Sequence, residues 1–331
     1  MTVCGERSAG DLVNAAELLG RRATVEAPAT IANLGAGYDT LGLAVDLAIR
    51  VTIEARAGDP RTSPVELRVD GEGEGELPAN RSNRLAVALE DGLTALGVTG
   101  ADRLSWTIDM ANEIPLERGL GSSAAATVAG IVAAGALVGR PIDGPTAIRL
   151  ATRIEGHPDN VAPALLGGLT SSITLDSGVE TIRLDPPDDV MVVAWIPDRR
   201  LATKEMRRVL PDLVPRADAV ANLARVAVGV AGLASGRSGA FAVLTQDRLH
   251  EPYRAAAYPE LPALVAAARD AGAIGACLAG SGSTIAAFVA ADGPVDEVGR
   301  ALEAASVALG LPGRLAGLRP QPVGARVVDA G

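Results

Sequence analysis

The chain has 331 residues, which is enough for two domains. Hydrophobic residues make up 48% and charged residues 21%, as is typical of a water-soluble globular protein with a sizeable core. A net charge of −10 and only 2% aromatic residues provide neither a basic stripe nor a stacking platform. We therefore expect no nucleic-acid partner.

The composition also indicates where the protein works. The N-terminal segment carries Glu6 and Arg7 and has no apolar stretch of the kind found in signal peptides. Two cysteines, Cys4 and Cys277, lie too far apart for a CxxC or zinc pattern, which favours a reducing compartment. The long low-charge run at 122–139 is short for a bilayer span and is better explained as a buried helix. We expect a cytoplasmic protein without a membrane partner.

In chain order, the first half mixes strands and helices. Residues 1–22 are expected to form an N-terminal extension, and 57–82, rich in Gly, Glu, Asp and Pro, should form turns or mobile surface. Gly97 would end the helix expected before it. The expected strands are 23–27, 41–54 and 104–108; the expected helices are 83–96, 124–138 and 144–155.

The second half begins with a hairpin expected at 169–175 and 179–184, turning about D-S-G. The D-P-P-D stretch at 185–188 is the best candidate for a linker. Beyond it we expect a buried strand at 191–196, helices over much of 204–270, and strands at 274–278 and 284–290. Both halves mix strands and helices, so the fold class is α+β with domains at 23–186 and 187–331.

The most informative segment is 115–125, P-L-E-R-G-L-G-S-S-A-A, between an expected strand and an expected helix. Free backbone N–H groups and the helix dipole make such a helix N-terminus favourable for phosphate. Gly119 and Gly121 let the backbone approach the oxygens, and Ser122 and Ser123 add hydroxyls that can reach phosphate or Mg²⁺. The segment predicts a nucleoside triphosphate site.

This loop departs from the two commonest nucleotide motifs. A Walker A loop needs an adjacent lysine, but the only lysine of the chain, Lys204, is remote in the sequence. A Rossmann loop needs a third glycine in register, and serines and alanines follow Gly121 instead. Alone, the segment fits a flexible turn before a helix equally well.

The chain has only two histidines. His157 lies in 155–160, E-G-H-P-D-N, a polar loop between apolar runs that favours a site over a spacer. The alternative there is a helix C-cap followed by an Asx turn. His250 lies in a mixed-charge helical stretch, 248–254, and we expect it on a solvated helix face.

Three segments in the same order resemble the GHMP kinases, at 28–39, 115–125 and 278–288. Within that superfamily the chain is most similar to the homoserine kinases, in A-N-L-G-A-G-Y-D at 32–39, in the loop 156–163 and in T-x-x-x-R at 203–207. The first segment lacks the lysine usual in mevalonate kinases, and no galactokinase signature is found. The resemblance implies an N-terminal domain like domain 2 of ribosomal protein S5, a ferredoxin-like C-terminal domain, and an active site between them.

The resemblance also implies a reaction, the phosphorylation of L-homoserine by ATP to O-phospho-L-homoserine, a step of threonine biosynthesis. ATP and Mg²⁺ would be the cofactors, with Ser123 and Glu155 as oxygen ligands of the metal. The residues that would hold ATP and its phosphates are Pro115, Gly119, Leu120, Gly121, Ser122, Ser123, Ala124 and Ala125.

The same resemblance places the acceptor. Asn33, Asp39 and Asp159 would hold its ammonium and hydroxyl ends, and Arg207 and Arg254 would clamp its carboxylate, a task suited to the guanidinium fork. The full implied pocket is Asn33, Asp39, His157, Asp159, Asn160, Thr203, Arg207 and Arg254, and the implied catalytic residues are Asp159, Glu155 and Ser123.

Asp159 could act as a general base or only orient the hydroxyl. An ordinary aspartate is a poor base for an alkanol, so we favour orientation. Two other functions stay open: a GHMP kinase for another hydroxy-amino acid or a mevalonate-type alcohol, and a non-catalytic ligand-binding regulator. The sequence leaves a homodimer open and marks the adenine pocket only weakly, around 80–85.

Overall fold

The structure, a computed structural model, describes residues 12–58 and 65–331. Half of the expected extension at 1–22, with Cys4, and part of the expected turn segment 57–82 therefore lie outside the described residues. The described start of the chain forms β1 (Val13–Asn14) and the short 3-10 helix η1 (Ala15–Leu18). β1 pairs in parallel with β5 (Val98–Thr99), which is followed by η2 (Ala101–Arg103).

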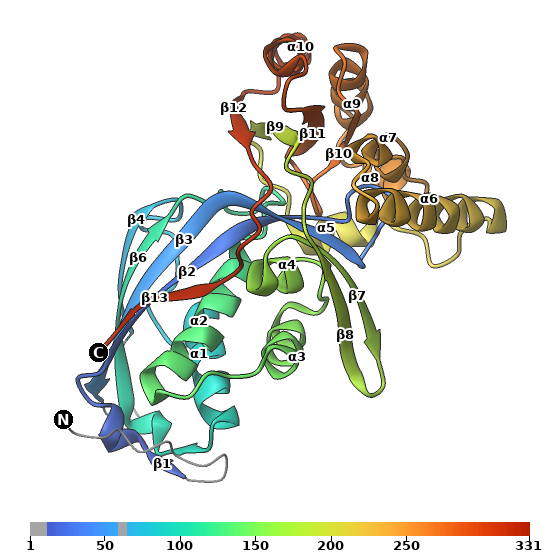
Figure 1. The fold of residues 1–331 in the computed structure, drawn as a ribbon. Coiled ribbons are helices and arrows are strands. Elements are labelled where there is room, and N and C mark those ends of the chain that lie inside the picture. Colours follow the sequence, from blue (N-terminus) through green and yellow to red (C-terminus); the bar gives the residue numbers. More distant parts are fainter. Residues whose placement is uncertain (1–11, 59–64) are drawn as a thin grey trace.

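A large twisted sheet organises the first half of the chain (Figure 1). Its described strands follow the spatial order β13 (Arg326–Ala330), β2 (Arg22–Ala32), β3 (Leu41–Ala57), β6 (Leu104–Asn112) and β4 (Val65–Gly71). The hairpin of β7 (Leu169–Leu175) and β8 (Gly178–Leu184), which the sequence predicted, pairs with β3 through β7. All the pairings are antiparallel except β4 with β6, and the last strand of the chain returns to pair with β2.

Helices cover one face of this sheet. α2 (Ser122–Val138) lies against β2, and α1 (Arg84–Ala95), α3 (Gly144–Glu155) and α4 (Val161–Leu166) pack around it (Figure 1). α2 is almost uniformly apolar and mostly buried, because Ala and Gly allow its neighbours to approach on several sides. A Cβ atom at Gly130 would overlap the carbonyl oxygen of Leu85 in α1, so the two helices touch at their backbones.

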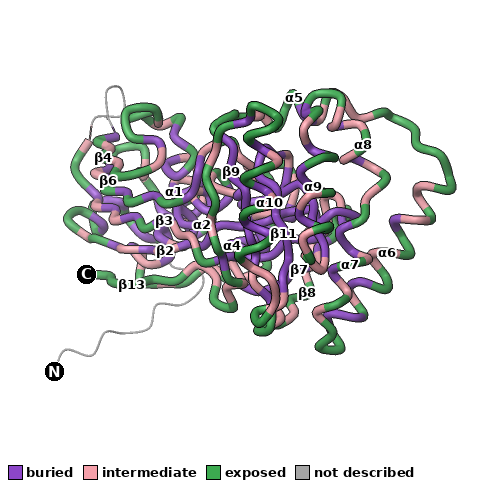
Figure 2. The backbone as a smooth tube through the Cα atoms, turned by 90° about the horizontal axis from the view of Figure 1, so that it is seen from above, coloured by how far each residue is buried: buried purple, intermediate pink, exposed green. Residues whose placement is uncertain are grey.

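A second, smaller sheet has the order β10 (Gly275–Leu278), β11 (Ile285–Ala290), β9 (Val190–Pro197) and β12 (Gly313–Leu318). α9 (Leu261–Asp270) and α10 (Val295–Ala308) cover one face and form a core with Val193 and Trp195 of β9. The alternate β9 residues, including Val192 and Ala194, join the core of the first domain. Figure 2 shows this buried material running without a break between the two halves.

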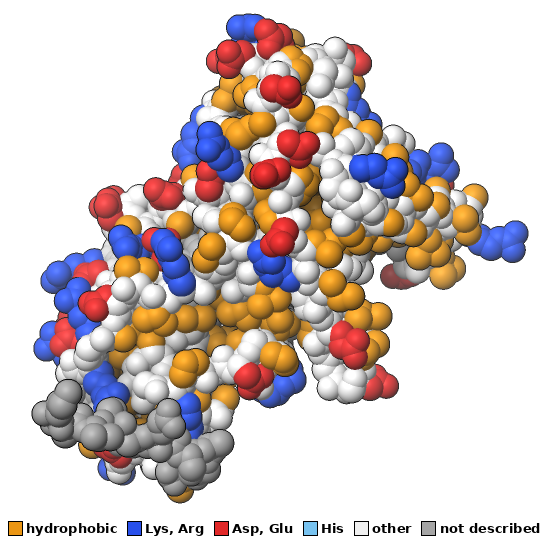
Figure 3. All heavy atoms as spheres, in the orientation of Figure 1, with side chains coloured by type: hydrophobic (Ala, Val, Ile, Leu, Met, Phe, Trp, Pro, Cys, Tyr) orange, Lys and Arg blue, Asp and Glu red, His pale blue; other side chains and the backbone are white. Residues whose placement is uncertain are grey.

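The remaining helices flank the smaller sheet: α5 (Thr203–Arg208), α6 (Arg216–Ala234), η3 (Ser238–Ala240), α7 (Phe241–Leu244) and α8 (Glu251–Arg254). α6 projects from the body, and hydrophobic side chains show along it in Figure 3. By length and composition it is the one described helix that could cross a membrane, but a single such helix is weak evidence for a membrane span. The expectation of no membrane partner stays a prediction.

The two-domain α+β GHMP kinase fold implied by the resemblance is confirmed. The smaller sheet with α9 and α10 gives the C-terminal half its antiparallel α+β form. The expected linker at 185–188 lies between β8 and β9.

The close approach at Gly130 predicts that Gly130→Ala destabilises the protein by about 1–3 kcal/mol, because overpacking outweighs the gain in helix propensity. Gly144→Ala is the matched control, since a Cβ atom at this α3 position meets no atom within 4 Å. Urea unfolding midpoints measure both. An unchanged midpoint for Gly130→Ala would show that α1 and α2 separate at no cost.

Candidate active site

Four loops meet where the two domains join. They follow β2, β6, α3 and β10, at residues 33–40, 113–121, 156–160 and 279–284. Backbone bonds hold them together: Thr30 N–H donates to Leu120 O at 3.0 Å, and Gly280 N–H donates to Ala32 O at 3.1 Å. A cavity of about 990 Å³ opens between these loops.

The segment 115–121, which we call the phosphate loop after its predicted ligand, leads directly into α2. Gly121, at φ 73°, turns the chain into the helix, and no side chain caps the first turn, so its N–H groups stay available. A side chain would not fit at either glycine: a Cβ at Gly121 would overlap Thr30 Oγ1, and one at Gly119 would overlap Ala279 O. The tight packing fixes the backbone that faces the cavity.

Two hydroxyls converge on one carboxylate at this end of the cavity. Ser123 Oγ donates to Glu155 Oε1 at 2.9 Å, and Thr127 Oγ1 donates to the same oxygen at 2.7 Å. Thr127 was not predicted from the sequence. It lies four residues after Ser123, so helical spacing would have placed it on the same face.

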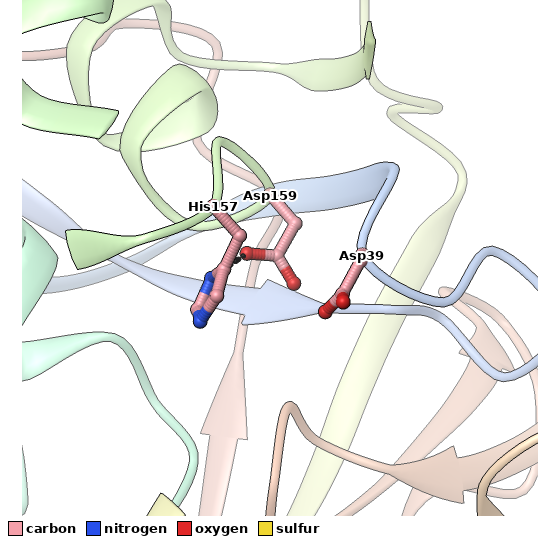
Figure 4. Close-up of side chains that lie close together, drawn as sticks. All are labelled: Asp39, His157 and Asp159. Atoms are coloured by element: carbon pink, nitrogen blue, oxygen red, sulfur yellow. Dashed lines mark hydrogen bonds and ion pairs between the residues drawn. The ribbon is translucent and has the colours of Figure 1, made fainter. Parts of the chain in front are cut away.

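A second group of polar side chains lies at the other end (Figure 4). His157 and Asp159 come from the loop after α3, and Asp39 comes from the loop after β2. His157 Nδ1 and Asp159 Oδ1 are 2.8 Å apart, and this hydrogen bond raises the pKa of His157 against the opposing effect of burial. Asp159 is only 2% exposed. A ligand atom of each of these three residues lies within 4.8 Å of the others.

Arg207 of α5 holds Asp39 from the opposite side. Its two terminal nitrogens donate to Asp39 Oδ1 at 2.7 Å and Oδ2 at 3.0 Å, a bidentate ion pair. Arg207 Nη1 also donates to the Tyr38 hydroxyl at 2.9 Å, and the guanidinium lies 5.7 Å from the centre of that ring. Despite burial, the hydrogen bond to Asp39 raises the pKa of Arg207.

Arg254 lies deeper, at the end of α8, and is 1% exposed. Its Nη1 donates to Gly280 O at 2.7 Å, and Asn33 Nδ2 donates to the same carbonyl oxygen at 2.8 Å. Asn33 therefore ties the first motif (28–39) to the third (278–288), and Arg254 ties α8 to the third.

The expectation for His250 was wrong. It is fully buried, not solvated, because the loop after β2 and the Tyr38 ring cover this end of α8. Burial lowers the pKa of His250 to about 4. The adjacent Glu251 is half-buried; its Oε1 accepts the Leu278 N–H at 2.7 Å, and burial of the carboxyl group raises its pKa to about 8.

The cavity wall gathers nearly every residue that the resemblance implied. Ala125 is the exception: it is buried in α2, and its N–H bonds Gly121 O. Lys204, remote from the phosphate loop in sequence, shares the cavity with it. Of the weakly marked adenine segment 80–85, Arg84 reaches the wall. The implied residues on the wall are Asn33, Asp39, Pro115, Gly119, Leu120, Gly121, Ser122, Ser123, Ala124, Glu155, His157, Asp159, Asn160, Thr203, Arg207 and Arg254.

Comparisons with known proteins agree with this arrangement. Two family models match the chain, the GHMP kinases N terminal domain at 83–168 and the GHMP kinases C terminal at 230–308. Together with the fold and the shared cavity, they define the class of protein as a GHMP kinase.

The relatives are more specific. Homoserine kinase of Moorella thermoacetica is 40% identical over 304 residues, which cover 92% of this chain and 99% of that protein. Homoserine kinase of Streptomyces coelicolor is 42% identical over 271 residues, covering 81% and 84%. This chain therefore belongs to the homoserine kinase family.

Solved structures agree. The crystal structure of homoserine kinase from Cytophaga hutchinsonii has a TM-score of 0.82 at 29% identity and covers 93% of this chain and 97% of its own. L. major mevalonate kinase in complex with R-mevalonate has a TM-score of 0.65 at 16% identity, covering 90% and 96%, and shares the fold.

The phosphate loop predicts a large effect of one methyl group. Gly121→Ala should lower kcat/KM about 100-fold, because the overlap with Thr30 must shift the loop by a large fraction of an ångström. Gly236→Ala is the control: it has the same φ of 73° but meets no atom within 4 Å. Steady-state kinetics compare the two variants, and equal activities would show that the overlap at Gly121 does not shift the phosphate loop.

Glu251 predicts a pH-dependent stability. Its folded pKa of about 8 lies above the ordinary value of 4.5, so folding takes up a proton between these pH values. The stabilisation is full below about pH 4.5 and is lost as the pH rises through 8. Glu251→Gln cannot ionise, so its thermal midpoint should match the wild type near pH 4.5 and exceed it increasingly up to pH 8.

Thermal melts at pH 5, 6.5 and 8 test this expectation, with Glu303→Gln, an exposed position on α10, as the control. A difference between Glu251→Gln and the wild type that stays constant with pH would contradict it.

Proposed function

We propose that this kinase transfers the γ-phosphoryl group of ATP to the side-chain hydroxyl of L-homoserine, with Mg²⁺ as cofactor and the cytoplasm as its location. One observation carries the proposal. A phosphate-binding helix N-terminus and a cluster of carboxylate and guanidinium groups suited to an amino acid face the same cavity. The names of the relatives support the choice of acceptor.

The ATP side uses the backbone. The N–H groups of 119–124 and the positive end of the α2 dipole would surround the β- and γ-phosphates. Phosphoryl transfer depends mostly on such positioning and on charge neutralisation. Lys204 and Arg208 on the same wall add positive charge where the transferred group would pass.

The residues at the α2 N-terminus suit Mg²⁺. Ser123, Thr127 and Glu155 offer oxygen atoms only, the donor type that this ion prefers. The other acidic group, Asp39, His157 and Asp159, includes an imidazole and already holds the Arg207 guanidinium. We therefore propose Ser123 and Glu155 as the residues that would hold the metal, which would supply positive charge to neutralise the phosphates when bound.

The acceptor side matches a zwitterion. Homoserine has an ammonium, a carboxylate and a hydroxyl, and Asp39 and Asp159 offer carboxylates to the ammonium and the hydroxyl. Arg207 and Arg254 offer guanidinium groups to the carboxylate of homoserine. His157, Asn160, Asn33 and Thr203 complete the wall.

The deciding experiment is an ADP-release assay with MgATP and L-homoserine, threonine or mevalonate as acceptor. We expect turnover with L-homoserine at a kcat/KM at least about 100-fold above the other two. Mevalonate lacks the ammonium, and threonine carries its hydroxyl one carbon closer to the charged ends, so neither places all three groups as homoserine does. Release of ADP with mevalonate alone, or with none of the three, would overturn the proposed acceptor or the kinase activity.

Asp159 is proposed to orient the hydroxyl, with the proton leaving late or to the phosphate. On this view Asp159→Asn keeps a polar contact and lowers kcat by less than about 100-fold, below the range for loss of a general base. Steady-state kinetics with L-homoserine measure the change. A loss of 10²–10⁴-fold in kcat at unchanged KM would instead assign Asp159 as the base.

A further inference from the structure

His250 lies just before α8, fully buried, and each of its ring nitrogens has a partner. Nε2 lies 2.8 Å from the carbonyl oxygen of Gly35, in the first motif. Nδ1 lies 3.0 Å from Arg254 Nη1. The imidazole therefore joins a loop 215 positions away in the chain to the buried guanidinium.

The two partners determine the tautomer. A guanidinium only donates, so Nδ1 must be unprotonated; a carbonyl oxygen only accepts, so Nε2 carries the hydrogen. A neutral ring satisfies both, in agreement with a pKa lowered by burial to about 4. The charged groups that face the ring are Asp247, with Oδ2 3.7 Å from Nε2, and Arg254, with Asp39 farther away.

Two of the three guanidinium nitrogens of Arg254 have hydrogen-bond partners among the described residues. Nη1 bonds His250 and Gly280 O, and Nε donates to Met206 O at 3.4 Å. Within 12–58 and 65–331, no group accepts a hydrogen bond from Nη2, although Arg254 reaches the cavity wall. Nη2 is therefore the nitrogen that an anionic ligand in the cavity could take.

Tyr38 completes the support. Its ring stacks on His250 at 5.1 Å between centroids and lies 5.6 Å from the Arg254 guanidinium. The plane of the guanidinium is thus set by the ring and by the acceptor at Nδ1. If Nδ1 were lost, Arg254 could turn about its remaining bonds and direct Nη2 away from the cavity.

We propose that His250 is a positioning residue that orients Arg254 toward the carboxylate of the amino-acid acceptor. The inference rests on the proposed function, since it assumes that the acceptor carries a carboxylate. The proposal gives His250, which does not line the cavity, a role in selecting the acceptor.

Two substitutions separate the two ring nitrogens. An asparagine amide oxygen falls near the position of Nδ1 and can accept from Arg254, while the bond to Gly35 is lost. A glutamine amide falls near Nε2 and can donate to Gly35, while the acceptor for Arg254 is lost. Each variant is assayed with L-homoserine and with 3-amino-1-propanol, which is homoserine without its carboxylate.

His250→Gln should raise the KM for L-homoserine about 10- to 100-fold, the equivalent of one hydrogen bond to a charged group. His250→Asn should restore most of that loss. The KM for ATP, and kcat/KM for 3-amino-1-propanol, should stay within about threefold of the wild type in both, since neither ligand uses Arg254.

Equal losses in both variants, or parallel losses with ATP and 3-amino-1-propanol, would overturn the proposal and leave His250 a packing residue. If the wild type does not phosphorylate L-homoserine, the proposed function fails instead. If it does and the variants show no selective effect, only the role of His250 fails.

A measurement on the unaltered protein covers the case in which a variant does not fold. The chain has two histidines, so ¹⁵N-histidine NMR with a His157→Gln sample assigns both rings. We expect His250 to show the Nε2–H tautomer and to shift with L-homoserine but not with 3-amino-1-propanol. An Nδ1–H tautomer, or the same response to both ligands, would overturn the proposal.

Discussion

The carbonyl oxygen of Gly280 is the point on which the site depends. Asn33 of the first motif and Arg254 of α8 both donate to it, at 2.8 and 2.7 Å. The backbone of the same residue donates to Ala32 O at 3.1 Å. Since buried polar groups must find partners, these bonds keep the first and third motifs together, and the phosphate loop packs on them through Gly119.

The union of the two domains follows from the strand β9. Its alternate side chains enter different cores, Val193 and Trp195 with α9 and α10, Val192 and Ala194 with the first domain. A strand buried on both faces cannot shift by one residue without exchanging the two cores. Arg118, from the phosphate loop, also donates to the carbonyl oxygens at the end of β9, so the loop is attached to both domains.

The cavity differs in charge from the rest of the chain. The protein has a net charge of −10, which would repel nucleotides and amino-acid carboxylates at long range. Five positive side chains lie on the cavity wall beside four acidic ones: Arg84, Lys204, Arg207, Arg208 and Arg254. Arg254 is buried, so the low dielectric around it strengthens its interactions most. Binding of phosphate groups and a carboxylate in one cleft would therefore depend on a local arrangement that opposes the overall charge.

The sequence by itself determined the elements and the chemistry of the loops. Small residues in 122–138, the D-S-G turn and Gly97 each act over a few positions, so local rules predicted α2, the hairpin and the end of α1. Glycine and serine at a helix N-terminus indicate phosphate for the same local reason, and the order of three motifs identified the family.

Only the tertiary structure decided which polar groups meet and which are buried. His250 stands in a mixed-charge stretch that is typical of a solvated helix, yet a loop 215 positions away covers it and bonds its ring. Thr127 faces Glu155 from another helix, 28 positions away. Burial and hydrogen-bond partners depend on segments distant in the chain, so local pattern and the family resemblance named the candidate residues of the site but not the contacts that orient them.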